Sequence, residues 1–236
     1  MLLSIIVPAY NEEKRIGEML ATYWDYFKSQ DVEFVIVVNG STDNTIGITT
    51  AFAAAHPERV QQYDIKEKIG KGGALHLGYR QARGEWIGFV DADLATVPGE
   101  FQKVISVALE HDGAIASRWK RGSEIVNRSI MRNIASMGFR VMVKLLFWFP
   151  YADTQCGAKV FRREAIVSVV PHLRVQNMAT DVETLHFLRR KGYDIVEVPT
   201  RWIHRSGSAF LGSPAKFFFS ALRIVGTLLS IRLRYQ

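Results

Sequence analysis

The 236-residue chain has a single cysteine, so it can form no internal disulfide, CxxC pair or cysteine-rich zinc site. Its six histidines are too scattered for metal-ligand spacing. The start has neither a basic leader nor a small-residue cleavage site, which favours a protein without a secretory signal. RNA-binding, zinc-finger and helix-turn-helix patterns are also missing, so we expect no nucleic-acid partner. With 48% hydrophobic and 22% charged residues, the chain predicts a folded α/β domain on the cytoplasmic side of the cell membrane.

Acidic side chains are almost absent from two segments. Residues 1–113 carry 10 basic and 16 acidic side chains, whereas residues 114–149 carry 7 basic ones against Glu124 alone. Residues 201–236 carry 6 basic side chains and no acidic one, so each of these two segments has a net charge of +6. Because both segments are also rich in apolar residues, they favour contact with an anionic membrane surface. The alternative is a packing helix whose basic face is merely solvated.

Both basic segments have helical periodicity. In residues 126–149, apolar side chains recur at steps of three and four, and mostly basic ones recur every four residues on a neighbouring face. The apolar set is Ile130, Ile134, Met137, Val141, Leu145 and Trp148; the other set is Arg128, Arg132, Ser136, Arg140 and Lys144.

The last segment is too short to span a membrane. In residues 209–236, only 15 residues separate Lys216 from Arg232, and Arg223 interrupts them. As a helix they would span roughly 22 Å, whereas the hydrocarbon core is roughly 30 Å thick. We therefore predict an amphipathic helix that lies in the membrane interface.

Strand and helix patterns alternate through the first half of the chain. Buried strands are predicted for the apolar run ending at Pro8 and for residues 33–38 and 86–93. A short strand is predicted at 59–65 and another strand at 113–118, with helices at 12–29, 41–55, 72–82 and 98–111. This alternation predicts an α/β fold with a mostly parallel sheet and helices on both faces. Ligands bind at the carboxyl ends of such strands, which are followed here by Tyr10–Glu12, Asn39–Ser41, Asp91–Asp93 and Arg118.

Asp91 and Asp93 flank one small residue at the end of an apolar run. If the strand continues through them, both carboxylates point the same way, and two close like charges favour a cation between them. Oxygen ligands with open positions suit Mg²⁺ or Mn²⁺ that holds a substrate diphosphate. The alternative is a capped turn before the helix that begins near Pro98.

Three further groups have both a functional and a structural interpretation. Gly70–Gly73 opens a helix, where backbone N–H groups and Lys71 could bind an anion or where the glycines could simply cap the helix. The Asn39 amide could pair with a base edge or stabilise a turn. Asp181 and Glu183, at a predicted helix start, could serve the site or cap the helix. Cys156 is more typical of a small buried residue than of a nucleophile.

The ordered set of motifs resembles family 2 inverting glycosyltransferases of the GT-A (Rossmann-like) fold, in the branch that acts on polyprenyl phosphates. The matching pieces span residues 1–208: IIVPAYNEEKRI, VNGSTDNT, GKGGALHLGY, WIGFVDADLAT, the Ser-Arg pair at 117–118, DTQCGAKVFRREA and the DVE triplet at 181–183. The set looks most similar to dolichyl-phosphate β-glucosyltransferases, with dolichol-phosphate mannosyltransferases second.

The resemblance implies a role for each matching residue. The nucleotide sugar would be held by Pro8, Tyr10, Glu12, Asn39, Lys71 and Asp91. The metal would bind Asp91 and Asp93, with Asp181 and Glu183 near the transferred sugar. The acceptor phosphate would be bound by Arg118, Arg132 and Ser136. Residues 1–208 would form the catalytic domain, with 114–149 as a membrane-facing insert.

Two positions depart from the family pattern. The family usually has two aspartates before Gly-Ser, where this chain has Val38 and Asn39, which leaves the base undefined. Near residue 208 a Ser-Lys pair is common; here it is Ser208-Ala209, and Arg205 is expected to supply the positive charge.

The expected reaction is transfer of a hexose from a nucleotide diphosphate sugar to polyprenyl or dolichyl phosphate, with inversion, at the membrane surface. A GDP-mannose donor and a soluble or polysaccharide acceptor remain alternatives. So do a non-catalytic nucleotide-sugar binder and a membrane scaffold. A homo-oligomer or a membrane subunit is a possible partner.

Overall fold

The computed structural model describes residues 2–127, 130–205 and 214–234. In chain order, its elements are β1 (Leu3–Ala9), α1 (Ile16–Phe27), β2 (Val32–Asn39), α2 (Thr45–Ala55), β3 (Val60–Ile65), α3 (Gly70–Gln81), β4 (Trp86–Val90), α4 (Pro98–Ala108), β5 (Gly113–Ser117), β6 (Glu124–Val126), α5 (Ile130–Phe147), β7 (Ala158–Arg162), α6 (Arg163–Val169), the 3-10 helix η1 (Val170–His172), α7 (Thr180–Arg190), β8 (Ile195–Pro199), β9 (Arg201–Ile203) and α8 (Pro214–Arg234).

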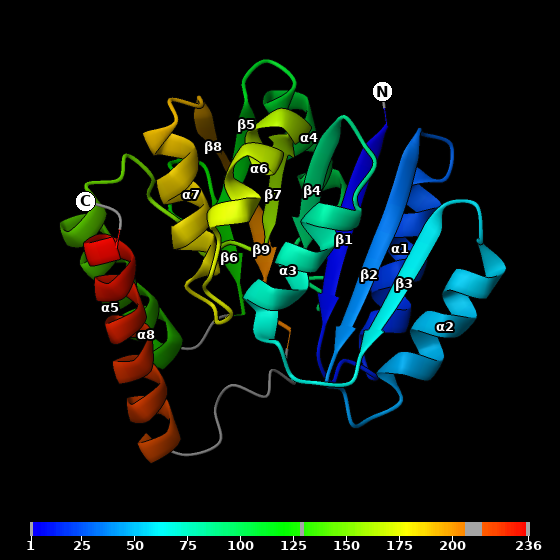
Figure 1. The fold of residues 1–236 in the computed structure, drawn as a ribbon, viewed down its shortest axis with the longest axis horizontal. Helices are drawn as coiled ribbons and strands as arrows, with labels where there is room; N and C mark the ends of the chain where they lie inside the picture. The colour runs from blue at the N-terminus through cyan, green and yellow to red at the C-terminus, as the bar shows by residue number, and fades with distance from the viewer. Residues whose placement is uncertain (1, 128–129, 206–213, 235–236) are drawn as a thin grey trace.

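A seven-stranded sheet with the order β3-β2-β1-β4-β7-β5-β8 runs through the centre of the fold (Figure 1). All neighbouring strands are parallel except β7, which is antiparallel to both β4 and β5. The short strands β6 and β9 form a separate parallel pair. The mostly parallel sheet is therefore confirmed, while the insertion of a later, reversed strand between β4 and β5 was not predicted.

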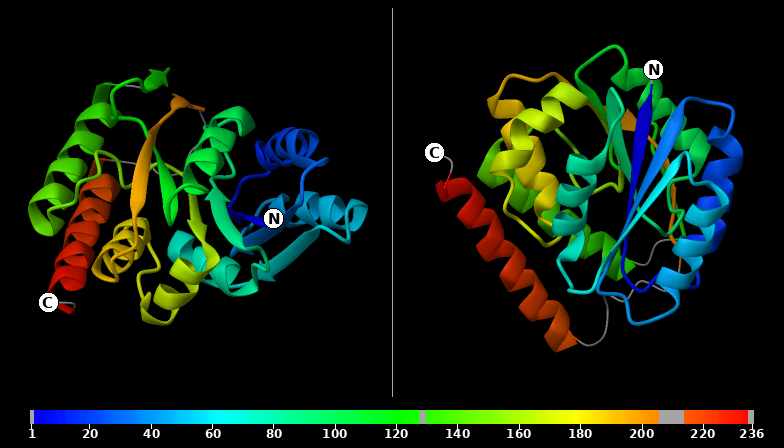
Figure 2. Two further views of the ribbon diagram at one scale, coloured as in Figure 1. Left: turned by 90° about the horizontal axis from the view of Figure 1, so that it is seen from above. Right: turned by 45° about the vertical axis from the view of Figure 1, so that its right-hand side comes forward.

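Helices cover both faces of the sheet (Figures 1 and 2). On one face, apolar residues of α1 and α4 form a core with β1 and β2, to which α2 adds a partly buried edge. On the other face, α3, α6 and α7 pack on the sheet, and buried residues of α5 and α8 extend this second core. The continuous apolar runs of the central strands follow from burial on both faces, because a strand between two helix layers has no solvated side.

Helices α5 and α8 pack against each other at one edge of the molecule (Figure 2). Val143 and Phe147 of α5 are buried in the core, and Leu228 and Ile231 of α8 are fully buried beside them. The apolar face predicted for residues 126–149 points instead to solvent: Met137, Val141, Leu145 and the adjacent Trp148 are at least half exposed. Within the described parts of the chain, no helix is both long and apolar enough to cross a bilayer.

His76 links two helices beside the sheet edge. Its ring lies 3.2 Å from the Thr180 hydroxyl at the start of α7, and only 6% of the residue is exposed. Burial, with smaller contributions from the Arg80 and Arg174 charges, lowers the pKa of His76 to about 4. Because the unfolded chain binds a proton near pH 6.5 and the folded one does not, stability falls as the pH drops from 6.5 to 4.

We expect His76→Gln to remove this share of the pH dependence, because glutamine keeps a polar partner for Thr180 but does not titrate. Urea unfolding at pH 7 and pH 4 should show that the wild type loses on the order of 3 kcal/mol more free energy of unfolding than the variant. Equal losses in the two proteins would contradict the assignment.

Candidate active site

The polar residues that follow β1, β2, β4 and β5 come together, because these strands are parallel and their carboxyl ends lie side by side. We call this line of strand ends the active-site edge of the sheet. Hydrogen bonds tie the first two loops to each other. The backbone N–H of Asn11 donates to the Ser41 hydroxyl over 3.0 Å, and the Asn11 side-chain oxygen accepts the N–H of Thr42 over 2.8 Å. Asn11 adopts a positive φ of 52°, as does Gly40 at 66°, so both loops turn sharply at this edge.

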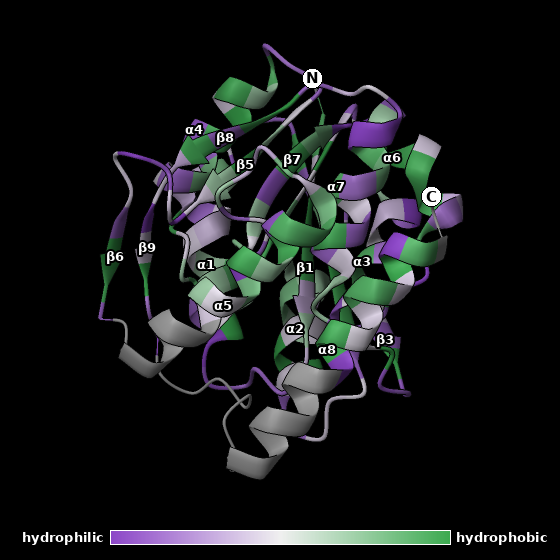
Figure 3. Ribbon diagram, turned by 90° about the vertical axis from the view of Figure 1, so that its left-hand side faces the viewer, coloured by the Kyte–Doolittle hydropathy of each residue, from purple (hydrophilic) through white to green (hydrophobic). Residues whose placement is uncertain are grey.

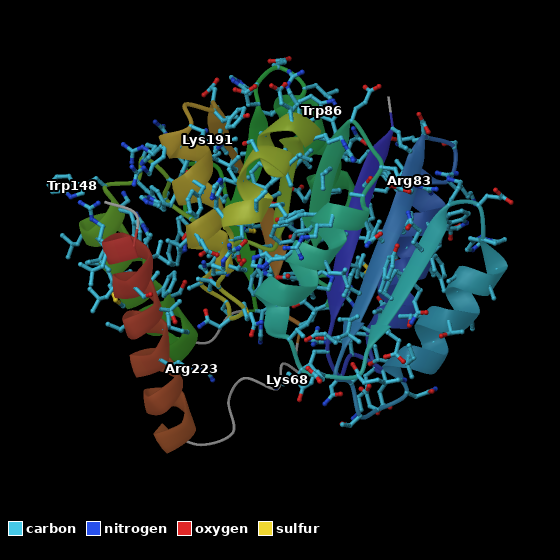
Figure 4. All side chains as sticks on the ribbon, in the orientation of Figure 1. Lys68, Arg83, Trp86, Trp148, Lys191 and Arg223 are labelled. Atoms are coloured by element: carbon cyan, nitrogen blue, oxygen red, sulfur yellow. The ribbon has the colours of Figure 1, made fainter. Side chains whose placement is uncertain are left out.

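Pro8, Tyr10 and Asn39 lie together around the ends of β1 and β2. Nδ2 of Asn39 donates to the Ala9 carbonyl over 2.9 Å, while its Oδ1 is buried without a hydrogen-bond partner among the described residues. The ammonium of Lys68 lies 3.8 Å from the centre of the Tyr10 ring. Figure 4 shows Lys68 at the edge where the strands end. The amide of Asn39 is therefore fixed, with a free acceptor oxygen.

The prediction that the strand continues through Asp91 and Asp93 is wrong. β4 ends at Val90, and the two aspartates lie in the turn that follows it. One carboxylate oxygen of Asp93 accepts the N–H of Ala95 over 3.0 Å, which closes the turn. The N–H of Asp91 donates to the Gly157 carbonyl over 3.0 Å. A Cβ on Gly157 would overlap Oδ2 of Asp91, so only glycine leaves room for this carboxylate. The two carboxylates are thus positioned by side-chain capping and by loop contact.

Four side chains of alternating charge lie in a row that leads from Asp91 into the interior of the protein. Nζ of Lys71, at the start of α3, lies 2.9 Å from Oδ1 of Asp91 and 3.6 Å from Oδ2 of Asp181. Asp181 also accepts a 2.7 Å hydrogen bond from Lys159 of β7, whose ammonium donates to the Cys156 carbonyl as well. Asp181 and Lys159 are almost completely buried. We call Asp91, Lys71, Asp181 and Lys159 the charge chain.

The charge chain sets the ionisation of its members. Burial by itself lowers the pKa of Lys71, but the carboxylates of Asp181 and Asp91 outweigh it, so the net pKa is raised. Burial by itself raises the pKa of Asp91, and the Lys71 ammonium reverses this to a net decrease. For Asp93, burial and the charge of Asp91 both act upward, so its pKa is raised. Lys71 thus fully reverses the effect of burial at Asp91, whereas at Asp93 Lys71 and Arg15 offset only part of the increase.

Glu12 completes the acidic surroundings of this turn. Both of its carboxylate oxygens accept hydrogen bonds from Arg15, at 2.6 and 2.7 Å. Burial nevertheless raises the pKa of Glu12, and the charges of Asp93 and Asp91 add to the increase against the effect of Arg15. The acids at the edge are therefore close enough to repel one another, and within the described chain Asp93 has no cationic partner in salt-bridge contact.

The residues fit a divalent cation that is shared with a substrate. No group of three or more acidic, histidine or cysteine side chains forms a complete metal site in the part of the chain that is described. Asp91, however, has a side chain that is 37% exposed, and Asp93 carries the uncompensated charge beside it. Mg²⁺ and similar ions are commonly held by one or two carboxylates together with substrate phosphates, which is the arrangement these residues allow.

Glu183 and Cys156 lie in the interior. The predicted helix start at 181–183 is confirmed as the first turn of α7, but neither acidic residue caps it. One oxygen of Glu183 accepts the N–H groups of Arg174 and Val175, at 3.0 and 2.9 Å, and the residue is fully buried. In this position Glu183 supports the preceding loop and has no exposed surface. Burial raises the pKa of the Cys156 thiol to about 12, which agrees with a buried residue and not with a nucleophile.

Two of the four predicted acceptor residues line one cleft. Arg118 and Ser136 line a shallow, solvent-open cleft between α5 and the loop at 151–155. Arg118 is held there by Asp153, through hydrogen bonds of 2.6 and 3.0 Å from its guanidinium and one from its backbone N–H. Arg205 lies elsewhere on the edge and pairs with Glu18 of α1 at 2.9 Å. The side chain of Arg132 lies outside the described residues.

Several site residues were missed by the sequence analysis. The role of Lys159 could not be predicted, because nothing in the sequence around this lysine indicates that it pairs with the distant Asp181 in the folded protein. Asp153 belongs to the motif DTQCGAKVFRREA, but its pairing with Arg118 was not predicted. Lys68 follows the third strand, and its contact with Tyr10 could have been anticipated from the rule that strand ends meet.

The family model for glycosyl transferase family 2 matches residues 4–169. The chain belongs to this family. It is 34% identical over 250 residues to a dolichyl-phosphate beta-glucosyltransferase of Drosophila melanogaster, an alignment that covers 99% of this chain and 75% of that protein. A protein of Trichomonas vaginalis with the same described activity is 36% identical over 213 residues, or 84% of this chain and 63% of that protein. The chain therefore spans only part of the length of these relatives.

The fold also matches solved structures. Glucosyl-3-phosphoglycerate synthase from Mycobacterium tuberculosis, in complex with Mn²⁺, uridine diphosphate and phosphoglyceric acid, is similar with a TM-score of 0.70 and 20% identity. The match covers 98% of this chain and 78% of that one. It confirms the GT-A-like fold of this family 2 glycosyltransferase.

We expect Gly157→Ala to weaken Mn²⁺-dependent binding of a nucleotide diphosphate and turnover by about 100-fold, because the new methyl group displaces the Asp91 carboxylate. Isothermal titration calorimetry measures the binding. Gly138→Ala in α5 is the matched control, since nothing lies within 4 Å of a Cβ at that position. Unchanged binding in a folded Gly157→Ala protein would argue against the placement of Asp91.

Proposed function

We propose that this family 2 enzyme transfers a hexose, with glucose as the first candidate, from a uridine diphosphate sugar to dolichyl or a related polyprenyl phosphate at a membrane surface. The observation that carries the proposal is the 34% identity to a dolichyl-phosphate beta-glucosyltransferase along 99% of the chain. Three features of the structure support it, namely the environment of Asn39, the engagement of the buried acids, and the outer faces of α5 and α8.

The Asn39 amide supports a base that presents an N–H group. One N–H of Nδ2 is donated to the Ala9 carbonyl, and the buried Oδ1, which has no partner among the described residues, is an acceptor that a ligand can meet. An acceptor oxygen pairs with the ring N–H of uracil or guanine, whereas adenine and cytosine present no ring N–H on that edge. The Asn39 side chain can therefore accept a hydrogen bond from the base, as a carboxylate at this position would, but it carries no charge. The solved relative bound to uridine diphosphate favours uracil.

Asp91 and Asp93 would hold Mg²⁺ or Mn²⁺ on the donor diphosphate. Such an ion would neutralise the charge that develops on the leaving nucleoside diphosphate. Lys71 adds a second positive charge at the same place, and the opposing carboxylates of Asp91 and Asp181 keep it protonated. Lys71 would thus meet the diphosphate directly, whereas Asp91 and Asp93 would act on it through the cation.

The buried acids support an acceptor that arrives already ionised. A hydroxyl acceptor needs a general base, whereas a phosphate oxygen is anionic at neutral pH. Among the described residues of the edge, Asp181 is bound by Lys159, Asp153 by Arg118 and Glu12 by Arg15. Glu183 is occupied by two backbone N–H groups. The chain therefore provides charge and position for the acceptor, and a single in-line attack by the phosphate would invert the anomeric carbon.

The outer faces of α5 and α8 support docking on a membrane. Six of the nine exposed large hydrophobic side chains in the described chain gather there: Met137, Val141, Leu145, Trp148, Leu229 and Leu233. Figure 3 is viewed from the side of these helices, and Figure 4 shows Trp148 projecting at one end of the pair and Arg223 farther along α8. Apolar side chains beside basic ones are typical of interfacial helices on anionic lipid.

A donor screen tests the reaction itself. We expect the wild type, with Mn²⁺ and dolichyl phosphate, to form a radiolabelled lipid product from UDP-glucose and much less from GDP-mannose or UDP-GlcNAc. Asp93→Asn and Asp93→Ala should give no product at any metal concentration, because the uncompensated charge that addresses the ion is lost. In Asp93→Asn the side-chain amide oxygen would still accept the Ala95 N–H, so the turn is retained.

Asp112→Asn is the control for loss of a carboxylate away from the site. Efficient transfer to a soluble sugar but not to dolichyl phosphate would overturn the proposed acceptor. Full activity of Asp93→Asn at low metal concentration would overturn the metal assignment.

Point substitutions test membrane docking more sharply than removal of residues 209–236, because Leu228 and Ile231 belong to the core. We expect Leu145→Glu combined with Trp148→Glu to lower the affinity for anionic vesicles by at least about 100-fold, since two large side chains no longer enter the interface. Vesicle flotation measures the loss. Leu109→Glu, at a solvent-exposed site after α4, should float like the wild type. Equal flotation of all three proteins would contradict docking through this face.

A further inference from the structure

The cleft between α5 and the loop at 151–155 contains more positive charge than its predicted residues supply. Besides Arg118 and Ser136, it is lined by Arg140 and Lys144, which lie one and two helical turns beyond Ser136 on the same side of α5. Asp153 is the only acidic side chain among the lining residues, and it is neutralised by Arg118. The charges of Arg140 and Lys144 therefore remain without a counter-charge in the cleft.

Arg118 is held in place by Asp153. Two of its guanidinium nitrogens bind the two oxygens of Asp153, its own N–H binds one of them, and only 10% of its side chain is exposed. The N–H of Asp153 in turn donates to the Glu197 carboxylate in the middle of β8. A guanidinium fixed in this way holds the loop in place, and its two best-oriented donors are no longer available to a phosphate.

Arg140 is held ready for a ligand. Its guanidinium carbon lies 5.5 Å from the centre of the Trp119 ring, a cation–π contact that orients the planar group without using its hydrogen-bond donors. No carboxylate of the described chain forms a salt bridge with Arg140 or Lys144, whereas Arg118, Lys71 and Lys159 all have one. A planar fork with free donors matches the oxygens of a phosphate.

The walls of the cleft suit an amphiphile. Trp119, Phe139, Val143 and Tyr151 contribute apolar surface beside the basic groups. The neighbouring face of α5 carries the exposed side chains Met137, Val141 and Leu145. A ligand with an anionic head and a hydrocarbon chain would therefore meet charge inside the cleft and apolar surface outside it.

The cleft also adjoins the carboxylate turn. The loop that begins at Asp153 in the cleft ends at Gly157, which contacts Asp91 through the 3.0 Å hydrogen bond from the Asp91 N–H. The cleft and the Asp91 turn are thus joined by one loop, residues 153–157.

We propose that Arg140, with Lys144 and the Ser136 hydroxyl, binds the phosphate monoester of the lipid acceptor, beside an Arg118 that Asp153 holds in place. The inference rests on the proposed lipid-phosphate acceptor and assigns the residues that recognise it. It adds Arg140 and Lys144 to the residues expected to contact the phosphate.

Steady-state kinetics with UDP-glucose, Mn²⁺ and dolichyl phosphate test the assignment. We expect Arg140→Ala to raise the KM for dolichyl phosphate by about 10-fold or more, with the KM for UDP-glucose unchanged. Arg140→Lys should recover part of the loss, because it restores charge but not the fork. Arg121→Ala is the matched control, since this exposed arginine lies outside the cleft and its loss removes the same charge. An unchanged KM for dolichyl phosphate in Arg140→Ala overturns the inference.

Vesicle flotation distinguishes binding of the acceptor phosphate from binding of the bilayer surface. It also measures acceptor binding independently of the proposed reaction. Phosphatidylcholine vesicles would contain dolichyl phosphate, dolichol, or phosphatidylglycerol at equal charge to the dolichyl phosphate. We expect the wild type to bind best to dolichyl phosphate and Arg140→Ala to lose only that preference. If Arg140→Ala loses binding equally to vesicles with phosphatidylglycerol, Arg140 binds lipid headgroups in general and the inference is overturned. The inference is also overturned if the wild type binds vesicles with dolichol as well as vesicles with dolichyl phosphate. If the wild type prefers dolichyl phosphate but makes no lipid product, the proposed reaction fails while the binding site stands.

Discussion

The charge chain from Asp91 through Lys71 and Asp181 to Lys159 is the contact on which the active-site edge depends. Its members come from the end of β4, the start of α3, the start of α7 and β7, so one ionic network joins four elements. Removing one partner of a buried ion pair typically costs about 3–5 kcal/mol, although an apolar replacement of the whole pair can be neutral. The network therefore contributes alignment more than stability, because it holds the Lys71 ammonium beside the carboxylate turn.

The reversed strand β7 explains how the two halves of the edge are coupled. It lies between β4 and β5, although it follows both in the chain. Its preceding loop must therefore cross the carboxyl ends of both neighbours, where it meets Asp91 at one end and Arg118 at the other. A shift of this loop would move the donor carboxylate and the wall of the cleft together. The absence of a side chain at Gly157 and the Arg118–Asp153 pair fix its two ends.

The sequence predicted what depends on local pattern and missed what depends on tertiary partners. The parallel strands were predictable because β1, β2 and β4 are continuous apolar runs, and their ends identified the edge. The strand containing Asp91 was predicted three residues too long, since the periodicity of Trp86–Val90 carries no signal of the Asx turn that Asp93 forms with Ala95. The helical period of α5 was read correctly, but a period does not say which face is buried, and Met137 and Val141 point outward. The pairing of Arg118 with Asp153 joins residues 35 positions apart and could not be read from either neighbourhood.

The outward apolar face of α5 and the charged cleft beside it follow from the same helix. Its residues divide into three sides: Val143 and Phe147 enter the core, Arg140 and Lys144 line the cleft, and Val141 and Leu145 face solvent. A helix that serves three surfaces cannot rotate without exposing core residues, so insertion of the outer side into a bilayer would also fix the depth of the cleft. A lipid phosphate lies at the level of the headgroups while its chain stays in the hydrocarbon. The donor carboxylates, one loop away from the cleft, would then stand just above the membrane, where a water-soluble nucleotide sugar can reach them.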